Sequence, residues 1–352
     1  MQFADQYNND PLAQLFVTRM RLTPVRFAIL TVLIALISST FVAYITDTLA
    51  TLSSWSSGVW LLIFTPSLSG YYLWVTTSME KIVRYLRDSE VVDIVDGEVS
   101  SLFDHYLHPW RIYLSVVGAL TVGAVYFVTR TELQSWASYG LLPKLTSTVG
   151  ITIGSYMASM IGLTLLLNMW CIRELLHHKD FQPNPLHPDR AGGLGILSKY
   201  SLKTAYLAAV AGMVIGFTEY RIITQGVAIQ IWFVHLCIPL YLVWTVLCFF
   251  GPLLSARSEM KQWKERKLKA IADEFLVENT NVQNNLGAYT DPTEQGFDKV
   301  KTLKEYYDIV DTFPTWPFST GTLSRFILIG LAPLIPALFG IVEKIITERL
   351  IP

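Results

Sequence analysis

The sequence is poor in charge and in cysteine. Asp, Glu, Lys and Arg make up only 16% of its 352 residues, whereas 52% are hydrophobic; soluble domains carry about 25% charged residues. The net charge of −1 provides no overall field that would attract nucleic acid. The three cysteines, Cys171, Cys237 and Cys248, lie in or beside apolar runs without the spacing of a zinc or CxxC site. We therefore expect buried thiols and no cofactor.

The N-terminus lacks the pattern of a cleaved signal peptide. Its apolar run begins only after Arg26 and continues for about 20 residues, without an early apolar stretch followed by a small-residue cleavage site. We interpret this run as a retained first membrane helix, preceded by a cytoplasmic segment over residues 1–26.

Long apolar runs, by contrast, are abundant, and seven of them could cross a bilayer as helices of about 20 residues. They lie at 27–48, 55–77, 109–129, 147–172, 203–222, 227–254 and 323–346. The pattern predicts an all-α, polytopic membrane protein with about seven transmembrane helices, the first six forming a bundle over 27–254. The last span lies in segment 323–352 and contains two prolines in LAPLIPALFGI, so it is either continuous or broken.

The basic residues are distributed unequally between the two sides of these spans. With a cytoplasmic N-terminus, 22 of the 27 Lys and Arg residues fall on the inner side and 5 on the outer side. The positive-inside rule therefore predicts a periplasmic or extracellular C-terminus. It also places loops 78–108 and 173–202 and the segment 255–322 in the cytoplasm.

The segment 255–322 has the periodicity of two amphipathic helices. One apolar stripe contains Leu268, Ile271, Ala272 and Phe275, and the other contains Val300, Leu303, Tyr307 and Val310. We expect a cytoplasmic helical hairpin, with residues 257–312 available to a cytoplasmic ligand or protein. The basic run 261–269 is suited to contact with anionic lipid headgroups.

Small residues recur every four positions in three of the spans. The stripes are Gly150, Gly154, Ala158 and Gly162; Ser115, Ala119 and Gly123; and Ala208, Gly212 and Gly216. Such stripes let helices approach closely, either within one subunit or between the subunits of a homo-oligomer.

Polar residues at membrane depth are few. Asn168 and His235 are the main candidates, and His235 precedes Pro239 by one turn, so its own carbonyl lacks a helical donor. This favours a local polar cluster around His235, with a ligand or proton-relay role as the alternative. No predicted span contains a well-buried acidic or basic residue, which argues against a proton-coupled or ion-coupled transporter.

The most unusual stretch is PLHPDRAGGLGIL, at 185–197 between the fourth and fifth spans. One hypothesis is a metal site, although His177, His178, His187 and Asp189 lack the spacing of known metal motifs. A second is an anion cradle, in which the N–H groups of Gly192, Gly193 and Gly195 act beside Arg190.

The third and favoured hypothesis for this stretch is a structural elbow. Pro185 and Pro188 fix two backbone angles, and Asp189 can accept hydrogen bonds from N–H groups two or three residues further on. Arg190 would then pair with Glu174 or with the acidic cluster at 93–104.

Three stretches resemble a known group of proteins. HPDRAGGLGIL, PLLSARSEM and LAPLIPALFGI are similar to segments of uncharacterised bacterial multi-pass membrane proteins, over about the C-terminal half of the chain. The resemblance implies a location in the bacterial inner membrane and implies no activity.

Together these features favour an oligomeric channel or membrane effector that is regulated from the cytoplasmic side. A secondary transporter is the first alternative, although no internal repeat is evident. A membrane-embedded, metal-dependent enzyme using the His-Pro-Asp loop is the second, and an enzyme is the less favoured class. A structural protein that docks a partner through 257–312 is the third.

Overall fold

The computed structural model describes residues 10–53, 58–92, 108–129, 136–177, 181–225, 232–287, 294–318 and 320–350. In these ranges the chain is all-α, with one isolated bridge between Val92 and Phe181 as the single β-type pairing. Among the described residues, six helices are long and apolar enough to cross a membrane, as an integral membrane protein requires. They lie at Pro24–Ile45, Trp110–Val128, Leu141–His177, Gly195–Thr224, Ile238–Asn284 and Gly321–Ile346.

The second predicted span is the one that falls outside these six. Residues 58–88 form a continuous helix, made of a π-helical turn, η3 (Trp60–Phe64), and α5 (Thr65–Asp88). The C-terminal half of α5 carries Glu80, Lys81 and Arg84, which lower its apolar character. A count of seven spans therefore stays a prediction.

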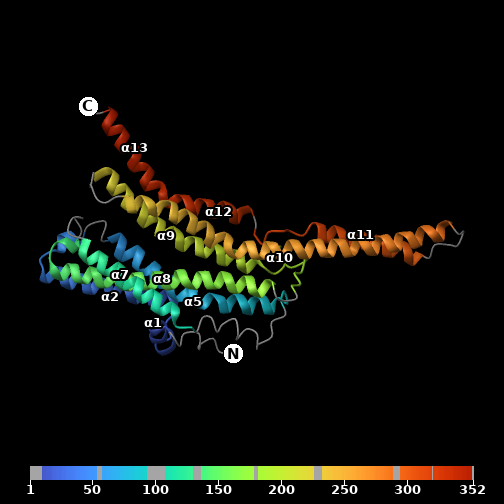
Figure 1. The fold of residues 1–352 in the computed structure, drawn as a ribbon, viewed down its shortest axis with the longest axis horizontal. Coiled ribbons are helices and arrows are strands. Elements are labelled where there is room, and N and C mark those ends of the chain that lie inside the picture. Colours follow the sequence, from blue (N-terminus) through green and yellow to red (C-terminus); the bar gives the residue numbers. More distant parts are fainter. Residues whose placement is uncertain are drawn as a thin grey trace.

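The helices form two groups that lie side by side along one direction (Figure 1). One group contains α2 (Pro24–Ile45), α5, α7 (Trp110–Thr129) and α8 (Leu141–His177), and the other contains α9 (Gly195–Gln225), α10 (Trp232–Gly287), α12 (Thr320–Leu331) and α13 (Ile335–Leu350). The core lies among α5, α8, α9 and α10. Outward positions of α2 are apolar and exposed, as lipid contact requires: Ile37 is 68% exposed and Phe41 is 64% exposed.

The two helices of the predicted hairpin pack against each other, and the first is a direct continuation of the sixth span, whereas a cytoplasmic hairpin stays a prediction. The helix α10 runs without a break for 56 residues, a length of about 84 Å. Its second half extends beyond the bundle beside α11 (Glu294–Asp311) (Figure 1). Ile271 and Val310 are buried as their stripes predict, whereas Ala272 and Tyr307 of the same stripes are exposed. The Lys299 ammonium lies 2.5 Å from the Glu278 carboxylate.

The last span is broken. A 3₁₀ turn, η5 (Ala332–Leu334), separates α12 from α13, and the chain changes direction there (Figure 1). The break packs against α9, where a Cβ at Gly216 would lie 2.1 Å from the carbonyl oxygen of Pro333. The two prolines prevent a regular helix at this point because they lack N–H donors.

The small-residue stripes of α7 and α9 lie at close contacts within one chain. A Cβ at Gly212 would lie 2.4 Å from the Tyr241 ring, and one at Gly123 would lie 2.2 Å from the Thr152 hydroxyl. The stripe of α8 differs, because a Cβ at Gly150 would meet nothing within 4 Å. The predicted close approach is therefore confirmed for Gly123, Gly212 and Gly216.

The expectation that no span contains a well-buried charged residue is wrong. Glu219 in α9 is only 1% exposed, and Arg111 at the start of α7 is 7% exposed. Arg111 donates from Nη1 to the Thr164 hydroxyl at 3.3 Å. Thr218, Tyr220 and Arg221 flank Glu219 and give this stretch the composition of a connection between helices. Sequence periodicity shows which face of a helix is apolar and not which charge a neighbouring helix covers.

The N-terminal segment packs onto the bundle from residue 10 onward. Asp10 caps the short helix α1 (Pro11–Ala13), which continues into the π-helix η2 (Gln14–Arg19). The Asp10 carboxylate also accepts hydrogen bonds from the hydroxyls of Tyr72 in α5 and Tyr156 in α8. This carboxylate therefore fixes the segment to two helices of the bundle.

We expect Tyr156→Phe to destabilise this attachment by about 1 kcal/mol, because one hydrogen bond to Asp10 is lost while the others remain. The thermal unfolding midpoint of the purified protein should fall accordingly. The matched control is Tyr44→Phe, since Tyr44 is 74% exposed. Equal midpoints for the two variants would contradict a stabilising role for the Tyr156 hydroxyl.

Candidate functional site

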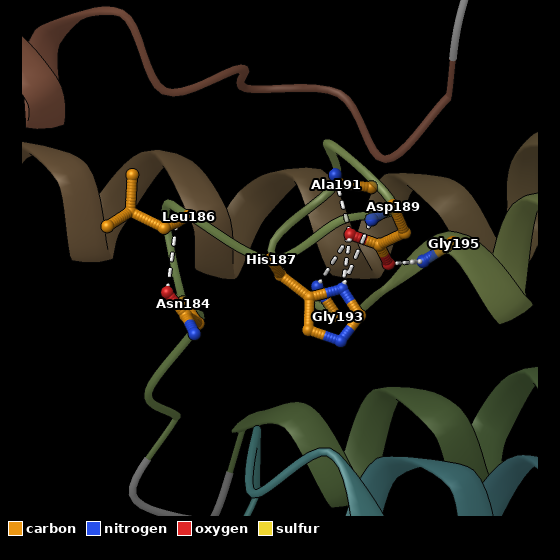
Figure 2. A network of polar contacts seen from close by, with 7 residues as sticks. All are labelled: Asn184, Leu186, His187, Asp189, Ala191, Gly193 and Gly195. Carbon is orange, nitrogen blue, oxygen red and sulfur yellow. Dashed lines mark hydrogen bonds and ion pairs between the residues drawn. The ribbon is translucent and has the colours of Figure 1, made fainter.

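The connection between α8 and α9 folds as a series of tight turns. The N–H of His187 donates to the carbonyl of Asn184 at 3.0 Å, and the N–H of Arg190 donates to the carbonyl of His187 at 3.0 Å. The Asn184 side-chain oxygen also accepts from the N–H of Leu186 at 2.9 Å (Figure 2). Asn and Pro residues favour such turns, so the stretch is an ordered elbow.

The Asp189 carboxylate is the centre of this elbow (Figure 2). Its Oδ1 accepts from the N–H groups of Ala191 at 2.9 Å and Gly193 at 3.0 Å, and its Oδ2 accepts from the N–H of Gly195 at 2.8 Å. Gly195 is the first residue of α9, so Asp189 caps that helix. The predicted bond to the N–H two residues further on is confirmed, and two more accompany it.

The hydrogen bonds control the charge of this carboxyl. Burial disfavours the charged form, but the three N–H donors and the His187 side chain outweigh burial and lower the pKa of Asp189 below its ordinary value. Asp189 is therefore a carboxylate at neutral pH.

His187 lies against the same carboxylate. Its Nδ1 is 2.8 Å from Asp189 Oδ1 and 3.3 Å from the backbone nitrogen of Asp189. The protonated ring donates from Nδ1 to the carboxylate, whereas a neutral ring with a bare Nδ1 accepts from the backbone N–H. Both protonation states therefore have a local partner.

Two glycines of the elbow have positive φ angles and also lie against other parts of the chain. Gly192 has φ 66° and Gly193 has φ 91°. A Cβ at Gly192 would lie 2.6 Å from the Phe313 ring, and one at Gly193 would lie 2.3 Å from Cγ2 of Val91. Glycine is required at these positions for its backbone conformation and for its lack of a side chain.

The elbow connects α5, α9 and the pair formed by α10 and α11 at one end of the bundle. Val91 lies three residues beyond the end of α5, and its carbonyl accepts from the N–H of Gln182 at 2.9 Å. Phe313 follows α11 and packs edge to face on Trp263 of α10, with ring centroids 5.4 Å apart. We call residues 181–194, with Val91, Trp263 and Phe313, the junction.

A lysine fixes the hairpin at the junction. The Lys264 ammonium of α10 donates to the backbone carbonyls of Asp311 and Phe313 and lies 3.3 Å from the Asp311 carboxylate. A cation at the C-terminus of α11 also complements the helix dipole. The position of Phe313 on Gly192 therefore depends on how α10 and α11 pack.

The candidate metal ligands are separated by their own partners. His177 Nδ1 lies 2.9 Å from Glu259 Oε1, whereas His187 pairs with Asp189. His178 lies outside the described residues. In the described part of the chain no three His, Cys, Asp or Glu side chains are grouped to hold a metal ion.

Two of the N–H groups that the anion-cradle hypothesis requires are already hydrogen-bonded. The N–H groups of Gly193 and Gly195 already bind the Asp189 carboxylate, so the chain supplies its own anion. Arg190 is exposed and has a left-handed backbone with φ 53°. Among the described residues it forms no ion pair with Glu174, and the cluster at 93–104 lies outside them.

Of the two intramembrane polar candidates, the structure describes the side chain of Asn168 but not that of His235. Asn168 is fully buried and donates from Nδ2 to the Tyr200 hydroxyl at 2.8 Å and to the Ser78 hydroxyl at 3.4 Å. It therefore links α8 to α5 and α9. The side chains of His235 and Cys237 lie outside the described residues, while Cys171 and Cys248 are buried and form no disulfide in the described part of the chain.

Comparison of the chain with protein-family models, with curated proteins and with solved structures gives no match.

Proposed function

We propose that this integral membrane protein is an oligomeric channel or membrane effector in a bacterial inner membrane, regulated from the cytoplasmic side. The observation that supports this function is the junction. There the hairpin meets α5 and the N-terminus of α9 through Phe313 on Gly192 and Val91 on Gly193. A partner or ligand that moves the hairpin would displace Phe313 and thereby strain the cap of a membrane helix.

Closely packed side chains do not deform continuously, so a movement of one element displaces the element packed against it. Contacts such as Phe313 on Gly192 can therefore couple the hairpin to the membrane helix α9. The broken last span and the glycine contacts of α9 are sites where such a displacement could be accommodated. The N-terminus would lie in the cytoplasm and the C-terminus on the opposite side.

Ion flux from liposomes that contain the purified chain tests this proposal. We expect flux above that of empty liposomes, and we expect Lys264→Gln to change it by about two- to fivefold. The mutation removes an ion pair with a largely exposed partner, a contribution of about 0.5–1 kcal/mol. The measurement is the rate of dye-reported ion entry at equal protein density.

The matched control is Lys261→Gln, one turn earlier in the same helix, where Lys261 pairs with exposed Glu265 at 3.6 Å. This variant should retain wild-type flux. Absence of flux from the wild-type protein, or a monomer in the membrane by single-molecule photobleaching, would contradict the channel proposal. Equal effects of both lysine variants would contradict a specific role for the junction.

A further inference from the structure

A cluster of aromatic rings lies where α5 of the first helix group meets α9 of the second. Trp74 of α5 stacks on Tyr200 of α9, with ring centroids 5.6 Å apart, and packs edge to face on Tyr71, also at 5.6 Å. The Lys203 ammonium of α9 lies over the Trp74 ring, 5.8 Å from its centroid. Tyr206 lies three residues beyond Lys203, on the same face of α9, and is 45% exposed. The rings and the lysine therefore form one patch that extends over both helices.

The patch is positively charged. Lys199 lies one turn before Lys203 on the same face of α9, and both side chains are exposed. Among the described residues neither lysine forms an ion pair, and the indole N–H of Trp74 donates no hydrogen bond. Two ammonium groups one helical turn apart, together with an indole N–H, can donate to different oxygens of one phosphate group. The donor set is therefore suited to a phosphate anion.

The position of the patch along α9 favours the phosphate of a lipid over a soluble one. Lys199 and Lys203 lie near the beginning of the spanning stretch Gly195–Thr224, where a membrane helix passes through the headgroups. Tryptophan and tyrosine are enriched at this level because their rings have an apolar body and a polar tip. Further along the same face of α9, Val210 and Met213 are apolar and partly exposed. A lipid can therefore contact the lysines with its headgroup and these side chains with its acyl chains.

We propose that the patch formed by Tyr71, Trp74, Lys199, Lys203 and Tyr206 binds the headgroup of an anionic phospholipid. Basic clusters between membrane helices at the headgroup level attract such lipids. The bound lipid contacts α5 of one helix group and α9 of the other, so it links the two groups where they meet. The proposal goes beyond the proposed function, because it requires membrane-spanning helices and does not require that the chain conducts ions.

Acetylation of lysines in the purified full-length protein, kept in detergent, tests the proposal, with peptide mass spectrometry locating each modification. Added phosphatidylglycerol should slow the acetylation of Lys199 and Lys203 about threefold or more, because the phosphate covers their ammonium groups. Phosphatidylcholine, which has no net charge, should not slow it. Inorganic phosphate at the same concentration should not slow it either, because it lacks acyl chains. Lys301, which is exposed on α11, is the internal control and should react equally in all conditions.

Lys203→Gln should weaken phosphatidylglycerol binding about fivefold in native mass spectrometry, the factor expected for one basic residue at a membrane surface. Lys203→Arg keeps the charge and should retain most of the binding, and Lys301→Gln should bind like the wild type. The acetylation result on the wild-type chain stands even where a variant fails to fold. Equal protection by phosphatidylcholine or by inorganic phosphate overturns the proposal. Unchanged lipid binding by a folded Lys203→Gln protein also overturns it.

Discussion

Asp189→Ala is expected to lower the free energy of unfolding by about 3 kcal/mol. The mutation leaves the N–H groups of Ala191, Gly193 and Gly195 without the carboxylate that binds them. Hydrogen bonds to a charged group contribute about 1.5–3 kcal/mol each and are not additive within one network. Amide hydrogen exchange of these three residues should accelerate more than exchange elsewhere in α9, because the loss is local.

Asp189→Asn is the graded control for this prediction. The amide oxygen can still accept from the N–H groups that bind Oδ1, but the amide nitrogen then faces the N–H of Gly195 in place of Oδ2. Its effect should be intermediate. Leu186→Ala, in the same elbow at a position 78% exposed, should have no effect. An Asp189→Ala protein with wild-type stability and exchange would show that the cap is dispensable.

The contribution of Asp189 depends on pH in a defined direction. Its pKa is lowered in the folded state, so the carboxylate stabilises the fold above its unfolded value, about 3.9, and this stabilisation is lost as pH falls through the lower folded value. The difference in unfolding midpoint between wild type and Asp189→Ala should therefore be constant from neutral pH to about pH 5. It should shrink only in stronger acid.

Local chemistry made part of this site predictable from the sequence. Asp189 two residues before Ala191, with prolines before it and glycines after it, indicates an elbow because each residue type has one strong backbone preference. The apolar runs likewise predicted the membrane helices, since a spanning helix needs about 20 apolar residues whatever its neighbours are.

The tertiary partners of the elbow were not predictable in this way. Val91 and Phe313 are ordinary apolar residues, about 100 and 120 positions from the glycines that they contact. No spacing in the sequence links them, because the contact depends on where α5 and α11 end in space. The burial of Glu219 was missed for the same reason, since it depends on the packing of other helices against α9.

Gly193→Ala is expected to destabilise the protein by about 3 kcal/mol. Alanine in the left-handed region, which φ 91° requires, costs about 1–2 kcal/mol. The new methyl group would also lie 2.3 Å from Cγ2 of Val91, a fully buried and β-branched side chain with little rotamer freedom. Overpacking of this kind adds about 1–3 kcal/mol.

A double-mutant cycle separates these two costs. Val91→Ala alone should destabilise the core through the cavity that it leaves, but it removes the atom that the new methyl group at position 193 would meet. Combined with Gly193→Ala, it should recover the overpacking part and leave the backbone part, which gives a favourable coupling of about 1–2 kcal/mol. Unfolding midpoints of the four proteins measure this coupling. Strict additivity would mean that Gly193 is required for its backbone conformation alone. The contact between Val91 and residue 193 would then add no cost to the substitution.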